Sequence, residues 1–228
     1  GDKNLEFAMP TGWNSKETAG LIKETLKNKN DVDIESDDTF VTATGYGRIS
    51  VDYADEVITE ITCHAKGATE ISGYDNCTVI DIGGQDTKVI SIVGGVVDDF
   101  IMNDKCSAGT GRFIEIMADR MGISLGELFE YASRGKSLKI SSMCTVFAES
   151  EIISLMGEGE DREDIASGIV DSVITKALQL ASRFDTKGNV VLTGGLAQND
   201  YFVRRLEEEI GNEVFTSEHS RFAGAIGA

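Results

Sequence analysis

The segment VIDIGGQDTK (residues 79–88) sets an aspartate inside an apolar strand and ends that strand at two glycines. Glycines let backbone N–H groups approach phosphate oxygens closely, because no Cβ stands in the way. Asp81 is placed to hold a hydrated Mg²⁺ that would bridge such phosphates. A glycine hairpin beside a buried, hydrogen-bonded aspartate fits the same residues, so this segment alone leaves both interpretations open.

The segment VVLTGGLAQN (residues 190–199) has a similar pattern, in which an apolar strand runs into Gly194 and Gly195 and then into a helix. Ligands in open α/β folds bind at such strand ends. Asn199 could cap the helix or contact the ligand. A tight strand-to-helix turn is the alternative for this segment alone. Two glycine-broken strand ends in one chain favour a nucleotide site.

Hydrophobic periodicity predicts a mixed α/β fold around these two strand ends. Helices are predicted at residues 15–29, with Ser15 as N-cap, and at 57–66, 110–121, after 125, 144–156, 163–184 and 200–210. Strands are predicted at 39–44, 78–82, 87–93, 96–102 and 190–193. Because no Pro- or Ser-rich linker is present, we expect two packed lobes, one of residues 1–77 with residues 212–228 returning to it, and one of residues 78–211.

Composition excludes several classes of protein. The chain has 228 residues and a net charge of −18, and such an acidic surface repels phosphate backbones, so no nucleic-acid partner is expected. No apolar run approaches the roughly 20 residues of a membrane helix, so no membrane partner is expected either. Four scattered cysteines are too few for a disulfide scaffold, which favours a reducing cytoplasm.

Cys106 and Cys144 each stand just before a predicted helix. A helix N-terminus favours thiolate and can donate hydrogen bonds to the sulfides of an anionic cluster. Two thiolates are half of a four-cysteine ligand set, which a symmetric homodimer would complete across its two-fold axis. Buried small side chains, or a redox disulfide between the two, are the alternatives.

The other two cysteines are assigned structural roles. Cys77 precedes a strand and is expected to pack as a small apolar residue. Cys63 and His64 are adjacent on a predicted helix and therefore point about 100° apart, which is unsuited to a catalytic dyad.

Four segments occur in order along the chain: DIGGQDTK (81–88), NDKCSAGTGRF (103–113), CTVFAESE (144–151) and TGGLAQN (193–199). With TATGYGR (42–48) and ITEITCHAKG (58–67), they resemble the activator (component A) family of 2-hydroxyacyl-CoA dehydratases, whose relatives include ATPase subunits of benzoyl-CoA reductase. The resemblance implies the acetate kinase, sugar kinase and actin superfamily fold, with two ribonuclease-H-like lobes and the nucleotide in the cleft between them. Residues 1–40 lack that superfamily's first phosphate motif, so N-terminal strands are expected to be missing.

The resemblance also implies roles for individual residues. Cys106 and Cys144 would be ligands of a 4Fe-4S cluster shared by two identical subunits. Residues implied to bind Mg²⁺-ATP are Asp81, Gly83, Gly84, Gln85, Lys88, Gly109, Thr110, Gly111, Gly194, Gly195 and Asn199. Candidates for positioning the attacking water are Gln85, Asp86 and Glu149.

The implied function is ATP-dependent one-electron donation to a 2-hydroxyacyl-CoA dehydratase or a related CoA-ester reductase. Reduced ferredoxin or flavodoxin would supply the electron. A small-molecule kinase of the same fold is one alternative, and it predicts phosphoryl transfer by iron-free protein. A nucleotide-binding sensor is another, and it predicts ATP binding without turnover.

Overall fold

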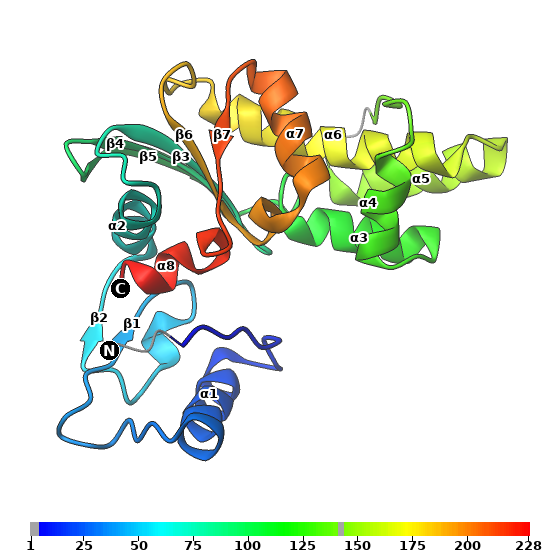
Figure 1. The fold of residues 1–228 in the computed structure, drawn as a ribbon. Coiled ribbons are helices and arrows are strands. Elements are labelled where there is room, and N and C mark those ends of the chain that lie inside the picture. The colour runs from blue at the N-terminus through cyan, green and yellow to red at the C-terminus, as the bar shows by residue number, and fades with distance from the viewer. Residues whose placement is uncertain (1–4, 141–143) are drawn as a thin grey trace.

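The centre of the fold is a five-stranded sheet in the order β5-β4-β3-β6-β7 (Figure 1). The structure is a computed structural model that describes residues 5–140 and 144–228. The strands are β3 (Cys77–Ile82), β4 (Thr87–Val93), β5 (Val96–Asn103), β6 (Val190–Gly194) and β7 (Val214–Phe215). β3 pairs antiparallel with β4 and parallel with β6, and Ile82 lies opposite Gly194. The carboxyl ends of β3 and β6, where both glycine pairs begin, therefore meet at one edge of the sheet.

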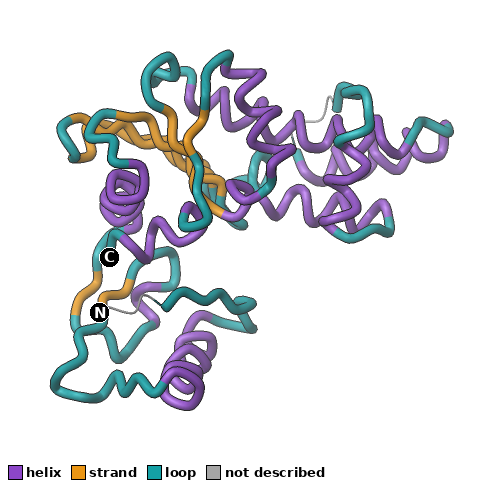
Figure 2. The backbone as a smooth tube through the Cα atoms, viewed as in Figure 1, coloured by secondary structure: helices purple, strands orange, loops and turns teal. Residues whose placement is uncertain are grey.

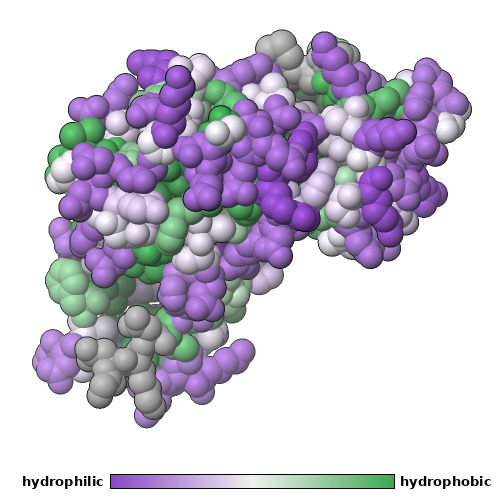
Figure 3. Space-filling model, turned by 45° about the horizontal axis from the view of Figure 1, so that its top comes forward, coloured by the Kyte–Doolittle hydropathy of each residue, from purple (hydrophilic) through white to green (hydrophobic). Residues whose placement is uncertain are grey.

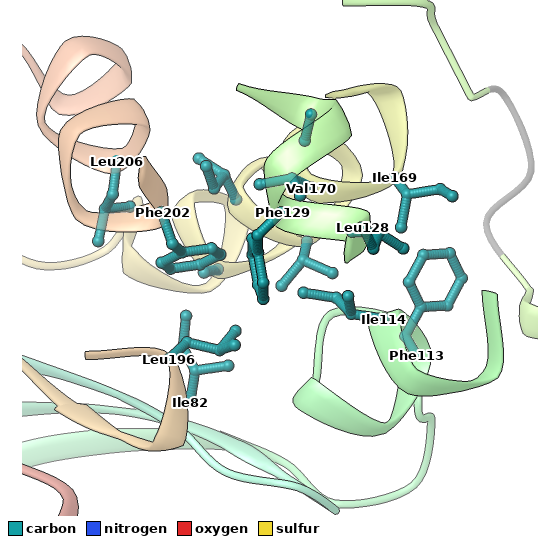
Figure 4. Close-up of a cluster of buried hydrophobic side chains, with 14 of the residues drawn as sticks. Ile82, Phe113, Ile114, Leu128, Phe129, Ile169, Val170, Leu196, Phe202 and Leu206 are labelled. Carbon is teal, nitrogen blue, oxygen red and sulfur yellow. The ribbon is translucent and has the colours of Figure 1, made fainter. Parts of the chain in front are cut away.

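A group of helices packs on one face of the sheet and extends beyond it; four of them lie between β5 and β6 in the chain, and the fifth lies between β6 and β7 (Figure 2). They are α3 (Gly111–Met121), α4 (Leu125–Ala132), α5 (Thr145–Glu158), α6 (Arg162–Ala181) and α7 (Asp200–Ile210). Ile82 of β3 belongs to the same buried cluster as Phe113, Phe129 and Phe202 from these helices (Figure 4). This core holds the carboxyl end of β3 against α3 and α6.

The opposite face packs on α2 (Glu60–Ser72), through Ala65 and Ala68. α2 in turn contacts the C-terminal α8 (Ala223–Ile226). The two helices touch through glycine: a Cβ at Gly67 would lie 1.8 Å from the Ala223 carbonyl oxygen, and one at Gly227 would lie 1.9 Å from the Cys63 carbonyl oxygen. Only glycine allows this backbone approach, which sets where the side chains of α2 point.

The N-terminal part of the chain forms α1 (Ser15–Asn30), the short 3₁₀ helix η1 (Arg48–Ser50) and a two-stranded parallel sheet of β1 (Thr42–Ala43) and β2 (Glu56–Val57). In Figure 1 these elements lie beyond α2 and α8, away from the large sheet. Two further 3₁₀ helices are η2 (Gly195–Gln198) and η3 (Ser220–Phe222).

The structure confirms the mixed α/β fold and corrects three local predictions. Asn14, not Ser15, caps α1, because its extended backbone lets its side-chain oxygen accept the Glu17 N–H at 2.8 Å. The helix predicted at 57–66 starts at Glu60, since Glu56 and Val57 pair with β1. The strand predicted at 39–44 is reduced to β1. The division into two lobes near residue 77 stays a prediction.

Hydrophilic side chains cover much of the face drawn in Figure 3, as the net charge of −18 suggests. Within the described ranges, no helix has the length and apolarity that crossing a membrane requires.

Candidate nucleotide site and cysteine pair

A cavity of about 810 Å³ lies at the sheet edge where β3 and β6 end. This volume is within the range of small-molecule sites, about 300–1,000 Å³. Its lining includes the glycine-rich strand ends, residues of α1 and α2, and Arg221 near the C-terminus. Predicted site residues in the lining are Asp81, Gly83, Gly84, Gln85, Asp86, Lys88, Gly111, Gly194 and Gly195.

Three of the four strand-end glycines show two different uses. Gly194 has φ +89°, and a Cβ there would lie 2.3 Å from the Ile82 carbonyl oxygen, so this glycine allows the close pairing of β6 with β3. Nothing lies within 4 Å of where a Cβ of Gly84 or Gly195 would be. Those two leave bare backbone beside the cavity, as a bound nucleotide requires.

Beneath the glycine loop lies a buried group of charges, here called the carboxylate knot: Asp81, Asp86, Glu60 and Lys88. Lys88 Nζ donates to Asp86 Oδ1 at 2.6 Å and to Asp81 Oδ2 at 3.2 Å, and lies 3.7 Å from Glu60 Oε1. Burial alone would lower the pKa of Lys88, but these carboxylates hold that pKa above its usual value. The ammonium therefore stays charged and oriented between the acids.

Asp81 is the most buried acid of the knot, with a side chain 3% exposed. Burial alone would raise its pKa, but His64, Lys88 and a 2.7 Å hydrogen bond from Thr193 Oγ1 hold the pKa below its usual value. Three carboxylates face one lysine, so the knot has a surplus of negative oxygen ligands of the kind that Mg²⁺ prefers. Oxygen chemistry of this kind suits a magnesium nucleotide, but among the described residues no three of these side chains are already arranged as a metal site.

Two residues of this site were not found from sequence: Glu60 and His64, both on α2. His64 Nδ1 lies 3.4 Å from Asp81 Oδ1, and both residues line the cavity. The sequence by itself indicates only structural roles for Cys63 and His64. Cys63 is fully buried, as that role requires, but His64 lines the cavity. Their spacing of four residues places Glu60 and His64 on one helix face, which is the signal the sequence held. Only the tertiary structure shows that this helix face lies against Asp81.

Two predicted residues lie apart from the cavity lining. Glu149, on α5, pairs with Arg120 of α3 at 2.5 Å. Asn199 caps α7 by accepting the Phe202 N–H at 2.9 Å. The roles of Glu149 in positioning water and of Asn199 in binding adenosine stay predictions, as do those of Gln85 and Asp86.

Gly109 and Thr110 are also outside the cavity lining, in the loop before α3. Gly109 has φ +91°, and Thr110 is fully buried.

All four cysteines carry free thiols, in two contrasting pairs. Cys106 and Cys144 are exposed, so their alternative as buried small side chains is wrong. Cys144 is the N-cap residue of α5, whereas Cys106 lies in the loop before α3. Cys63 and Cys77 are buried, and burial raises the pKa of Cys77 to about 11. The two exposed thiols are therefore the accessible ones.

The two exposed cysteines lie in segments that are held together. Ser107 Oγ and Thr145 Oγ1, each the next residue after a cysteine, are 2.8 Å apart. Within residues 5–140 and 144–228, no group of three His, Cys, Asp or Glu side chains is arranged to hold a metal ion. One chain therefore offers two exposed thiols, whereas a four-cysteine cluster needs four.

The sheet, the helices on both of its faces and the cavity at the strand ends define an actin-like ATPase fold. The chain belongs to the BadF/BadG/BcrA/BcrD ATPase family, whose model matches residues 12–228.

Known proteins similar to this chain include a dehydratase activator. The (R)-2-hydroxyglutaryl-CoA dehydratase activating ATPase of Acidaminococcus fermentans is 46% identical over 221 residues, 95% of this chain and 83% of that protein. The crystal structure of component A of this dehydratase superposes with a TM-score of 0.85 at 44% identity, and covers 95% of this chain and 83% of that one.

A second solved structure is the activator of 2-hydroxyisocaproyl-CoA dehydratase from Clostridium difficile with bound ADPNP, with a TM-score of 0.84 and 40% identity over 92% of this chain and 78% of that one. The ethanolamine utilization protein EutJ of Carboxydothermus hydrogenoformans has a TM-score of 0.59 at 13% identity, over 93% of this chain and 73% of that one. This last similarity concerns the fold alone.

Proposed function

We propose that this chain is an ATP-dependent activator that donates single electrons to a 2-hydroxyacyl-CoA dehydratase. The activators named above are its relatives at 40–46% identity, which supports the proposal. The observation that carries it is the pair of exposed thiols, Cys106 and Cys144, on segments joined by the Ser107–Thr145 contact. A kinase or a nucleotide sensor has no use for such a pair.

The nucleotide is assigned to the cavity at the strand ends. The backbone at Gly84 and Gly195 would face it, and the carboxylates of the knot would hold Mg²⁺ directly or through water. Lys88 keeps Asp81 and Asp86 oriented, because its ammonium bonds to both. Gln85, which is exposed in the lining, is the residue best placed to orient water.

The cluster is assigned to two copies of the chain, each giving Cys106 and Cys144. A 4Fe-4S cluster takes four thiolates, so one chain supplies half of the set. When bound, the cluster provides one-electron transfer, with reduced ferredoxin or flavodoxin as the source. Cys144 is the N-cap residue of α5, and Cys106 lies in the loop before α3.

Coupling between the nucleotide and electron transfer would follow from two dimer geometries of different free energy. ATP and its hydrolysis products can shift such an equilibrium only by binding the two geometries differently. We assign the difference in nucleotide affinity between the two geometries to the glycine loop and to the segments that are hydrogen-bonded to it. The cleft that holds the nucleotide would then lie between the two predicted lobes.

Anaerobic reconstitution with iron and sulfide tests the cluster. We expect Cys106→Ala and Cys144→Ala each to lose the cluster absorbance, bound iron and the dimer, while the control Cys77→Ala keeps all three. Retention of iron in both exposed-cysteine variants would contradict the proposal. Phosphoryl transfer to a small acceptor by iron-free protein would favour the kinase alternative, and nucleotide binding without turnover would favour the sensor.

A further inference from the structure

A hydrogen bond between the residues that follow them joins the segments of the two exposed cysteines. Ser107 Oγ and Thr145 Oγ1 are 2.8 Å apart and partly buried, although 38 residues separate them in sequence. Asn103 adds a second restraint on the first segment, because its Nδ2 donates to the Cys106 carbonyl oxygen at 3.0 Å. The hydroxyl pair therefore bridges the loop before α3 and the start of α5.

The first cysteine segment is bonded in turn to the glycine loop beside the cavity. The Ser107 carbonyl oxygen accepts from the Thr110 N–H at 3.0 Å and from Thr110 Oγ1 at 2.7 Å. The next two residues after Thr110 donate their N–H groups to the glycine loop, Gly111 to the Gly83 carbonyl oxygen and Arg112 to that of Gly84. Three consecutive residues thus connect Ser107 to the loop that ends β3.

Close packing stiffens this connection. A Cβ at Gly109 would lie 2.7 Å from Lys176 Cβ of α6, and one at Gly111 would lie 3.3 Å from the Gly83 carbonyl oxygen. Thr87 Oγ1, at the start of β4, donates to the Gly109 carbonyl oxygen at 2.6 Å. A segment packed this tightly shifts as a unit, because interiors are bistable and resist gradual deformation.

We propose that Ser107 and Thr145 are positioning residues that set the spacing of Cys106 and Cys144 and carry a displacement of the Gly83-Gly84 loop to Cys144. Cys106 is adjacent to Ser107 and would move with the Gly83-Gly84 loop, because Thr110 bonds to Ser107 and its next two residues bond to that loop. Cys144 follows through the hydroxyl contact, since Thr145 is the first residue of α5. The use of this coupling for electron transfer rests on the proposed function, whereas the coupling itself concerns only the thiols and the nucleotide.

Cluster-free protein gives a direct test through alkylation of individual thiols, followed by mass spectrometry with and without Mg²⁺-ADPNP. We expect ADPNP to change the alkylation rates of both exposed cysteines, by about fivefold or more if the coupling is of ordinary allosteric size. In Ser107→Ala and in Thr145→Val, the response of Cys106 should persist and that of Cys144 should be lost. The affinity of each variant for ADPNP should stay within about twofold of that of the unaltered chain, which is a smaller change than allosteric coupling usually produces.

Three controls keep the test decisive. Thr145→Ser keeps the hydroxyl and should restore the response of Cys144. Ser150→Ala removes an α5 hydroxyl that donates to the Val146 carbonyl oxygen of its own helix, and should change nothing. Cys63 and Cys77 should stay unreactive at pH 8 if the protein is folded, since both are buried and the pKa of Cys77 is about 11.

Two results would overturn the proposal: a Cys144 response that survives in both variants, or no ADPNP response of either thiol in the unaltered chain at saturating nucleotide. Failure of the proposed function gives a different result. In that case reconstitution yields no bound iron, while the nucleotide response of the two thiols and its dependence on Ser107 and Thr145 remain.

Discussion

The carboxylate knot and the cysteine pair lie at opposite ends of one hydrogen-bonded segment, and they are built in opposite ways. In the knot, the Asp81 and Lys88 side chains are each no more than 4% exposed and bond to several partners. Cys106 and Cys144 are exposed, and the hydroxyl contact between Ser107 and Thr145 joins their segments.

This difference separates a fixed part of the molecule from a movable one. Buried charges that are held by several hydrogen bonds keep one geometry, because a departure leaves a desolvated charge without a partner. Exposed groups with few bonds change position at low cost, and such regions are the ones that move in proteins that switch. A nucleotide bound against the knot would therefore transmit strain toward the cysteines.

The largest effect is expected at the knot. Lys88→Met should lower the free energy of unfolding by about 3–5 kcal/mol, because it leaves Asp81 and Asp86 buried without their counter-ion. Chemical denaturation of cluster-free protein measures this loss. Lys187→Met, at an exposed lysine, is the control and should stay within about 0.5 kcal/mol. A loss below about 1 kcal/mol for Lys88→Met, a typical value for an ordinary substitution, would show that the knot is not rigid.

Next in size is the difference between two neighbouring glycines at the end of β6. Gly194→Ala should cost about 1–3 kcal/mol from backbone strain, with a further loss because its Cβ would meet the Ile82 carbonyl oxygen. At Gly195 an added Cβ would have open space, and the backbone φ is not positive. The melting temperature of Gly195→Ala should therefore be almost unchanged. Thermal unfolding of the pair compares them directly. Equal melting temperatures would show that β3 and β6 can separate here.

The smallest effect is expected at Asn199. Asn199→Ala should cost about 1 kcal/mol through loss of the α7 cap, and Asn199→Asp should keep that stability. Nucleotide titration then decides whether Asn199 does more than cap. Unchanged ADPNP affinity in the alanine variant would restrict Asn199 to the cap, and weakened affinity in both variants would support its predicted contact with adenosine.

Much of the fold was predictable because its signals are local. The strands at 78–82, 87–93 and 190–193 were placed correctly, since a short apolar run that ends at glycine is typical of a buried strand followed by a turn. The errors lie in the short strands: β1 and β2 have two residues each and depend on each other for pairing, and the two-residue β7 was not predicted. Strands this short leave no periodicity to detect.

The candidate site was predictable only in part, for a similar reason. The glycine loops and the two lone thiols stand out because their residue types are unusual in their local contexts. Glu60 and His64 gave no such signal, since a helix face bearing an acid and a histidine is ordinary. Their place beside Asp81 depends on the glycine contacts between α2 and α8, which join residues far apart in the chain.

The amino-acid sequence by itself determined the glycine-broken strand ends, the mixed α/β class and which cysteines precede helices, because these depend on residue type and on spacing within a few turns. Only the tertiary structure decided that Lys88 turns inward to three carboxylates, that His64 meets Asp81, and that Ser107 contacts Thr145. Such contacts arise from the packing of whole helices against a sheet, where each residue's position depends on all the others.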